Sequence, residues 1–398
     1  MSNPDLLLVR LCDKEDVSAP ASGTRLSRIL ETAYAAASGY TCKTADGASE
    51  ALDALNAHHA GETCDTPLHV LFVISLPEDG VSFSLAAMLR VLRASRDLMR
   101  GCAGALIVDG AGELYTKSSA VQLVLAANSC GCAFIGRPLV EATGSLLNFA
   151  VTARNLGTDL TDACLQSVSA LVHALLAFRG FSVNREHAAD STPGADSHMP
   201  RLLALHASSH ETSNTFALWR ATREHLEGIE TREIGLRNGV LVDCSGCPFN
   251  MCLHFGENDS CFYGGVMTDD VYPALRETDA VLMICPNYND AISANLTAFI
   301  NRLTAMYRKR PFSDKALFAI VVSGYSGSDI VLSQLIAALN MNKSFYLPPY
   351  FALYATANDP GSVMKITDIG SQIASFASGI QKTLTAYQQE DKLGSETL

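Results

Sequence analysis

Four cysteines lie within eighteen residues of the chain, in the segment DCSGCPFNMCLHFGENDSC. They follow the spacing C-x2-C-x4-C-x8-C, as Cys244, Cys247, Cys252 and Cys261. Thiolates this close in sequence can converge on one small volume, which an iron–sulfur cluster or a tetrahedral zinc ion requires. The pattern predicts a metal centre, and the spacing alone leaves iron–sulfur and zinc both open.

The remaining cysteines are mostly scattered, and they suit the ordinary role of buried thiols that pack as small hydrophobic side chains. They are Cys12, Cys42, Cys64, Cys102, Cys130, Cys132, Cys164 and Cys285. Packing alone explains the dense four-cysteine segment less well. Cys244 and Cys247 by themselves could form a redox pair, but two further cysteines nearby favour a metal site.

A second segment suited to chemistry is HASSHETSNT, His206–Thr215. It follows an apolar run and opens into a helix, so small hydroxyl residues meet a helix N-terminus. Backbone N–H groups, the helix dipole and hydroxyl groups together suit a phosphate. Simple capping by Ser213 or Asn214 is an equal alternative.

The elements that must position these segments alternate between strand and helix, which predicts a doubly wound parallel α/β sheet. The expected strands are Arg201–Leu205, Thr231–Gly235, Ala280–Cys285 and Ala316–Val322. The expected helices are Asn214–Leu226, Asp269–Arg276 with Thr268 or Asp269 as its cap, Ile292–Met306 and Ser328–Leu339.

The first half of the chain repeats this rhythm. ALIVDG at Ala105–Gly110 resembles AIVVSG at Ala319–Gly324, and both precede a similar helix. The offset favours an internal duplication. Residues 180–200 are polar and aperiodic, so we expect domains at 1–179 and 201–388, a linker between them, and a polar tail at 389–398.

The second half resembles the flavodoxin-like family of NADPH-dependent FMN reductases, most closely its iron–sulfur flavoprotein branch. The resemblance covers roughly Arg201–Tyr354 and rests on five elements in order. These are the serine-rich loop ending in Asn214 and Thr215, the cysteine segment, the acidic helix start Asp269 and Asp270, the Pro286-Asn287-Tyr288 turn with the Ser293, Leu296 and Arg302 helix, and the Ser323-Gly324-Tyr325-Ser326-Gly327 loop.

The resemblance implies an FMN-dependent oxidoreductase or electron-transfer flavoprotein, with a four-iron four-sulfur cluster near the flavin and a nicotinamide or another iron–sulfur protein as electron donor. The implied phosphate contacts are Ser208, Ser209, Ser213, Asn214 and Thr215. The implied ring contacts are Pro286, Asn287, Tyr288, Asn289, Ser323, Gly324 and Tyr325. Tyr288 could instead be a half-exposed loop aromatic.

Two departures from the family pattern stand out. The phosphate loop lacks the usual arginine and has Ser209, His210 and Glu211 there, which weakens the prediction of FMN binding. The cysteine spacing is longer than the branch's C-x2-C-x2-C-x5-C. Two alternatives follow: an NAD(P)H-dependent FMN or quinone reductase with zinc or no metal, and a non-catalytic metal-stabilised scaffold.

The first half resembles a degenerate copy of the same fold. At its phosphate-loop position, Asp13, Glu15 and Asp16 would repel a phosphate, so we expect no flavin there. A fused copy could replace the partner of a dimeric reductase as a pseudo-dimer, which could itself pair as a homodimer. Glu113–Ser118 is a candidate lid or a plain polar connection.

Composition restricts the remaining functions. The net charge is −12, which disfavours binding to nucleic acid and to anionic membranes. We expect no membrane span because no apolar run reaches the required length of about 18 to 20 residues. The N-terminal sequence lacks the features of a signal peptide, so we expect a cytoplasmic protein whose thiols stay reduced.

Overall fold

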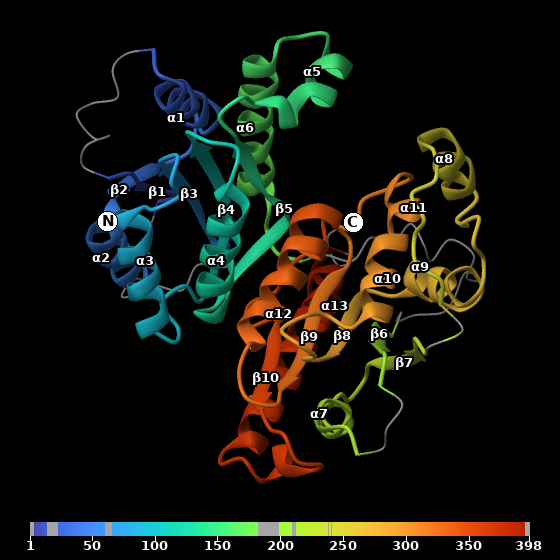
Figure 1. Cartoon of the computed structure of the whole chain (residues 1–398). Coiled ribbons are helices and arrows are strands. Elements are labelled where there is room, and N and C mark those ends of the chain that lie inside the picture. Colours follow the sequence, from blue (N-terminus) through green and yellow to red (C-terminus); the bar gives the residue numbers. More distant parts are fainter. Residues whose placement is uncertain are drawn as a thin grey trace. The chain divides into compact units, whose positions relative to one another are not determined.

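The computed structural model describes residues 4–13, 23–59, 66–181, 199–208, 212–237, 239 and 241–394. They divide into two compact units, Met1–Gly180 and Phe181–Leu398 (Figure 1). Most of the expected linker, residues 182–198, lies outside the described residues, as does the predicted phosphate contact Ser209. Each unit is described by itself.

The first unit is a parallel sheet covered by helices on both faces. Its described strands are β1 (Leu6–Leu11), β2 (Cys42–Asp46), β3 (Leu68–Leu76), β4 (Cys102–Gly110) and β5 (Cys132–Ala142), in the order β2-β1-β3-β4-β5. Its helices are α1 (Arg25–Ala36), α2 (Gly47–His59), α3 (Phe83–Ala94), α4 (Thr116–Ser129), α5 (Ala150–Leu156) and α6 (Leu160–Ala177), with a 3₁₀ turn at Leu147–Phe149.

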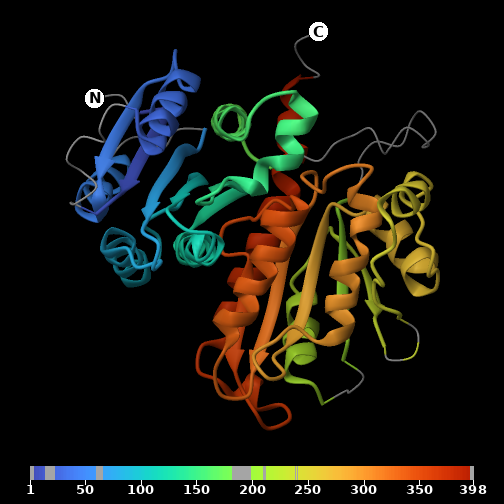
Figure 2. The ribbon, with the colours of Figure 1, turned by 45° about the horizontal axis from the view of Figure 1, so that its top comes forward.

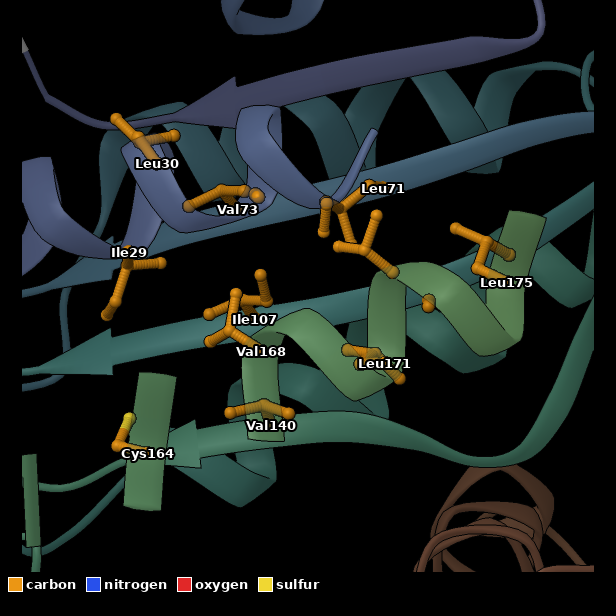
Figure 3. Close-up of a cluster of buried hydrophobic side chains, with 14 of the residues drawn as sticks. Ile29, Leu30, Leu71, Val73, Ile107, Val140, Cys164, Val168, Leu171 and Leu175 are labelled. Atoms are coloured by element: carbon orange, nitrogen blue, oxygen red, sulfur yellow. The ribbon is translucent and has the colours of Figure 1, made fainter. Parts of the chain in front are cut away.

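The core on one face of this sheet lies under α1 and α6. Figure 3 shows Leu71 and Val73 of β3 directed toward apolar side chains of both helices, among them Ile29 and Leu171. Among the described helices, α6 is the one long and apolar enough to be a candidate membrane span. Its apolar face instead packs against this sheet, as expected for a core helix.

The second unit has the same architecture. Its strands are β6 (Arg201–His206), β7 (Glu230–Gly235), β8 (Ala280–Pro286), β9 (Ala316–Ser323) and β10 (Ala352–Thr356), in the order β10-β9-β8-β6-β7. Its helices are α7 (Asn214–Arg223), α8 (Phe249–Glu257), α9 (Tyr272–Glu277), α10 (Ala294–Arg302), α11 (Thr304–Tyr307), α12 (Ser328–Leu335) and α13 (Ile369–Gly394), with π turns at Met267–Val271 and Ile336–Met341 and a 3₁₀ turn at Ser362–Lys365.

Both sheets share one strand order, because β1 corresponds to β6, β3 to β8, β4 to β9 and β5 to β10. This is the flavodoxin-like order, so the predicted fold class of two doubly wound parallel domains is confirmed. The segments that resemble one another in sequence, Ala105–Gly110 and Ala319–Gly324, belong to the equivalent strands β4 and β9. Descent of the two halves from one duplicated domain stays a prediction.

Some predicted elements were wrong in detail. The helix expected at Asp269–Arg276 begins earlier, in the π turn at Met267–Val271, so neither Thr268 nor Asp269 is its cap. The single helix expected at Ile292–Met306 is two helices that meet at Leu303. The last helix continues to Gly394, and the end of the second domain at residue 388 stays a prediction.

Candidate functional site

The loops after β6, β8, β9 and β10 lie at the carboxyl edge of the second sheet, where doubly wound folds bind their ligands. Asn287 connects two of these loops. Its Nδ2 atom donates to Ser323 Oγ at 2.9 Å and to the Ser326 carbonyl at 2.9 Å. Its Oδ1 atom is buried without a partner. The side chain therefore holds the edge together and keeps one acceptor unused.

The backbone of the same two loops is in an unusual conformation. Asn289 and Asp290 both have left-handed backbones, with φ of 55° and 56°. Gly327 has φ of 86°, and a Cβ atom there would lie 1.9 Å from Asp290 Oδ1. The left-handed backbone favours glycine here, and the missing Cβ atom lets the Asp290 side chain of the β8 loop lie against the β9 loop.

The described part of the phosphate loop ends at the start of α7. Ser213 caps the helix, because its Oγ accepts from Phe216 N at 3.4 Å. Asn214 donates to the carbonyls of Ala357 and Asp359, which ties the loop to the segment after β10. Thr215 is buried. The first N–H groups of α7 have no intrahelical acceptor, and they remain the available anion donors.

His206, the last residue of β6, supports the start of this loop. Its Nδ1 atom lies 3.0 Å from the Ser208 carbonyl, and its Nε2 atom lies 3.5 Å from Glu233 Oε1 on β7. Trp219 Nε1 donates to Glu233 Oε2 at 2.9 Å. Both His206 and Trp219 are buried, so they shape the loop from beneath and do not face a ligand.

Two tyrosine side chains are exposed to solvent at this edge of the sheet. Tyr288 after β8 is 58% exposed, and Tyr325 after β9 is 82% exposed. Asn358 Nδ2 lies 3.5 Å from the Tyr325 hydroxyl. Large aromatic surfaces exposed beside glycine-lined loops are suited to a planar ligand.

The four cysteines of the predicted metal centre line one cavity of about 160 Å³. All four are free thiols, and Cys244 is exposed while the other three are partly buried. Met251, Phe255 and Phe262 supply apolar walls. The structure therefore brings together the residues that the sequence singled out, although no three His, Cys, Asp or Glu side chains among the described residues are placed to hold a single metal ion.

Cations surround this cavity. Arg302 and Arg308 line it, and the Nε atom of each is buried without a partner. Lys343 is also close: burial lowers the pKa of its ammonium group, the charge of Arg308 lowers it further, and the thiols of Cys244 and Cys252 act in the opposite direction. Burial likewise raises the pKa of Tyr272, to which Cys261 adds.

The cavity lies toward the amino ends of the strands, away from the loops after β6, β8, β9 and β10. Its lining residues Arg302, Thr304 and Arg308 follow the C-terminal end of α10, and this helix runs back toward the amino ends of the strands. In both ribbon views α8 lies at the upper end of the second unit, and the segment after β10 lies at the lower end (Figures 1 and 2). That the cysteine segment lies near the flavin stays a prediction.

The equivalent edge of the first unit is closed by its own side chains. Arg25, at the start of α1, donates to the Asp109 carboxylate and to the carbonyls of Gly110, Thr143 and Gly144. Asp13, which the sequence suggested would repel a phosphate, accepts from the first N–H groups of α3. Glu15 and Asp16 lie outside the described residues.

Sequence reasoning missed several residues that build the two sites. Asn358 and Asp359 follow β10, a strand that the sequence did not predict. Asn301 donates to Asp243 Oδ1 at 3.0 Å, and the same oxygen accepts from Cys244 N at 2.6 Å. The one sequence signal for the cations of the cysteine cavity was the basic run Arg308-Lys309-Arg310, whose Arg308 lines that cavity.

The comparison with known protein families finds a match in the second unit. Residues 200–358 match the model of a family described as NADPH-dependent FMN reductase. No curated protein matches the chain.

Similar solved structures share low sequence identity with the chain. RosB with a bound 8-demethyl-8-formylriboflavin-5'-phosphate intermediate is 15% identical, with a TM-score of 0.39, over 48% of this chain and 81% of its own. An azoreductase from Bacillus anthracis str. Sterne is 14% identical, with a TM-score of 0.34, over 46% and 100%. The apo form of the NADH:FMN oxidoreductase EMOB is 15% identical, with a TM-score of 0.32, over 46% and 90%.

Proposed function

Residues 200–358 carry the sequence pattern of the NADPH-dependent FMN reductases, a family of FMN-dependent oxidoreductases, and on this premise we propose that the second unit binds one FMN at its carboxyl edge and uses it to transfer electrons. The observation that carries the proposal is that the matched segment contains the loops after β6, β8 and β9, which meet at this edge. FMN supplies the hydride and single-electron chemistry when it is bound. The part of the protein is to bind FMN, to orient it and to shield it from solvent.

The phosphate end is served by the start of α7. The N–H groups of Asn214 and Thr215 and the helix dipole attract an anion, and Ser208 and Ser213 add hydroxyl groups. The Asn214 side chain is already bonded to the segment after β10, so it fixes the loop and does not reach a ligand. Ser209, also expected to contact the phosphate, lies outside the described residues.

The ring end is served by the loops after β8 and β9. Pro286, Asn289, Ser323 and Gly324 shape the close approach of these loops. Asn287 offers its unused Oδ1 acceptor, and Tyr288 and Tyr325 offer exposed aromatic faces. These groups suit a flat heterocycle that carries both donors and acceptors.

For the cysteine cavity we propose a four-iron four-sulfur cluster held by Cys244, Cys247, Cys252 and Cys261. A cluster with four thiolates carries net negative charge and needs more room than one ion. The two unpartnered guanidinium N–H groups of Arg302 and Arg308 suit such an anion. The wide cavity fits a cluster better than zinc, whose four ligands lie at 2.0 to 2.3 Å from the metal.

A flavin reductase without metal is the second candidate, with a nicotinamide as its electron donor. It is favoured by the absence, among the described residues, of three side chains placed around a single metal ion. The four cysteines would then be free thiols in a partly apolar surface cavity.

Purification without oxygen, followed by an absorption spectrum and assays for iron, zinc and acid-labile sulfide, tests these proposals together. Flavin bands with about four iron and four sulfide per chain support the flavin and the cluster. Flavin bands without iron leave the metal-free reductase. A colourless protein that takes up no added FMN contradicts both.

A further inference from the structure

We propose that Arg302 is the positioning residue of the cysteine cavity. Its guanidinium group closes the cysteine segment into a loop, and its Nε–H group and charge serve the anion that the four thiolates hold. The second part rests on the proposed cluster. The first part concerns the protein alone and is tested without metal.

The closure is seen in two hydrogen bonds. Arg302 Nη1 donates to the carbonyl of Val242 at 3.2 Å, and Nη2 donates to the carbonyl of Gly264 at 2.8 Å. Val242 stands two residues before Cys244, and Gly264 stands three residues after Cys261. One side chain therefore joins the two ends of the segment that carries all four cysteines.

The guanidinium group is itself held in place. Arg302 is the last residue of α10 and is 2% exposed, and its own carbonyl accepts from the Tyr272 hydroxyl at 2.7 Å. The neighbouring Asn301 binds Asp243, which accepts from Cys244 N. The end of α10 thus fixes the start of the cysteine loop at two adjacent positions.

Arginine is suited to this task in a way that lysine is not. Its planar fork presents several N–H donors in fixed directions, whereas an ammonium group is a point charge on a flexible stem. Nη1 and Nη2 of Arg302 each donate to a separate carbonyl, and the Nε–H group is left unbonded. A lysine can keep the charge, but it cannot reproduce this divided geometry.

The Nε–H group of Arg302 has no hydrogen-bond partner within the described residues, and no ion pair of its charge is seen there. Arg302 Nε is buried and unbonded, and the acceptors of the other two nitrogens are neutral carbonyls. A buried cation without a carboxylate is unfavourable unless an anion lies close by. The cavity that this side chain lines contains four thiols, which become anionic when they bind metal.

Two consequences follow. The closing bonds join only protein atoms, so we expect the loop to stay closed in metal-free protein. When a cluster is bound, the cation and its N–H group stabilise the more negative, reduced form, since hydrogen bonds and positive charge near the sulfurs raise the reduction potential.

The closure is tested on metal-free protein by hydrogen exchange of the amides in residues 242–264. We expect Arg302→Gln and Arg302→Lys to exchange about tenfold or more faster there than the wild type, since each loses at least one closing bond. Arg310→Gln, which removes a nearby cation outside the cavity lining, serves as the matched control and should exchange like the wild type. Equal exchange in all four proteins would overturn the closure.

The tuning is tested after reconstitution with ferrous iron and sulfide, by a reduction titration followed by electron paramagnetic resonance. Arg302→Lys should keep its cluster but titrate at a lower potential than Arg310→Gln, and Arg302→Gln should hold less iron. Equal potentials in Arg302→Lys and the wild type would contradict the tuning.

Failure of the proposed cluster gives a different result. A wild type that takes up no iron removes the cluster but leaves the exchange result standing. FMN content and the thermal unfolding midpoint, measured on every variant, show whether the second unit is folded. If Arg302→Gln does not fold, Arg302→Lys and Asn301→Ala still test the closure.

Discussion

Single residues decide how closely the loops of the flavin edge approach one another. Gly327 combines a left-handed backbone with a contact that leaves no room for a Cβ atom beside Asp290. Asp13 in the first unit also has a role that depends on one side chain, because its carboxylate accepts from the N–H groups of both Phe83 and Ser84. Neither role is visible in composition or periodicity, since both depend on contacts between distant loops.

Gly327→Ala should reduce FMN retention, because the new methyl group displaces the Asp290 and Asn287 side chains and strains a left-handed backbone. Gly228→Ala is the matched control: Gly228 has a similar φ of 71°, and no atom lies within 4 Å of the position of its Cβ. It should lose only about 1 kcal/mol of stability from backbone strain. Flavin content after gel filtration measures both, and full retention in Gly327→Ala would refute the close approach.

Asp13→Ala should lower the free energy of unfolding by about 1–2 kcal/mol at neutral pH through loss of the α3 cap. Burial alone would raise the pKa of Asp13, but the hydrogen bonds from Ser84 and Phe83 outweigh it, and the net pKa is lowered. This contribution is therefore complete above the unfolded pKa of about 3.9 and is lost as the pH falls through the lower folded value.

Urea unfolding of the wild type and Asp13→Ala at a series of pH values measures this effect. Their difference should be constant near neutral pH and shrink below about pH 4. Ser82→Ala, which removes the uncharged cap that accepts from Leu85 N, should show a loss that does not depend on pH. A difference for Asp13→Ala that stays constant into acid would contradict the prediction.

At the scale of whole elements, α8 and α11 hold the cysteine cavity between them. Gly256 of α8 lies against the backbone of α11, and a Cβ atom there would be 2.3 Å from the Ala305 carbonyl oxygen. Because α8 also contains Cys252, its seat on α11 fixes the position of one of the four thiols.

Gly256→Ala should displace α8 and reduce iron uptake severalfold, since backbone cannot move aside as a flexible side chain can. Gly379→Ala in α13 is the control, because its Cβ position is open and the change should stabilise the helix by about 0.5–1 kcal/mol. Iron content after reconstitution and thermal unfolding measure both variants. Normal iron uptake in Gly256→Ala would show that the close contact is not needed.

The strand β7 was predicted within one residue of its bounds although it is mostly exposed, and the buried strands were predicted equally well. Strands β6, β8 and β9 were predicted within one residue of their bounds, because buried parallel strands read as continuous apolar runs. The edge strand β10 alternates between buried and exposed residues over five positions and was missed. Helix α8 was missed because it is only nine residues long and lies inside the cysteine segment, so its apolar positions in PFNMCLHF form too short a pattern.

The candidate metal site was also predicted only in part. Cys244, Cys247, Cys252 and Cys261 line one cavity, as their spacing suggested. The place of that cavity in the fold could not be predicted, because it depends on where α10 ends and which carbonyls Arg302 binds. Those are tertiary contacts with no local signature in the sequence.

The whole molecule combines two units of one topology with unequal edges. In the second unit the family match and the open loops coincide. In the first unit Arg25 occupies the position equivalent to Asn214, and its bonds to Asp109 and three carbonyls fill the edge. We therefore expect chemistry in one unit only.

The chain should bind one FMN per 42.5 kDa, as measured by flavin release and protein concentration. Arg25→Gln should leave this ratio unchanged and lower the stability of the first unit by about 1–3 kcal/mol, since several hydrogen bonds to a partly buried cation are lost. A ratio of two, or loss of flavin in Arg25→Gln, would contradict the assignment of the flavin to the second unit.

The exposure of Cys244 has a consequence for how the protein behaves in air. An accessible thiol beside three others can be oxidised to a sulfenic acid and then condense with a neighbour into a disulfide, which removes two ligands at once. The flavin edge, at the other end of the sheet, contains no cysteine among its loop residues described above. Handling in air should therefore remove the iron and leave the flavin bound. Aerobic and anaerobic preparations of the same chain should then differ in iron content and in absorption spectrum.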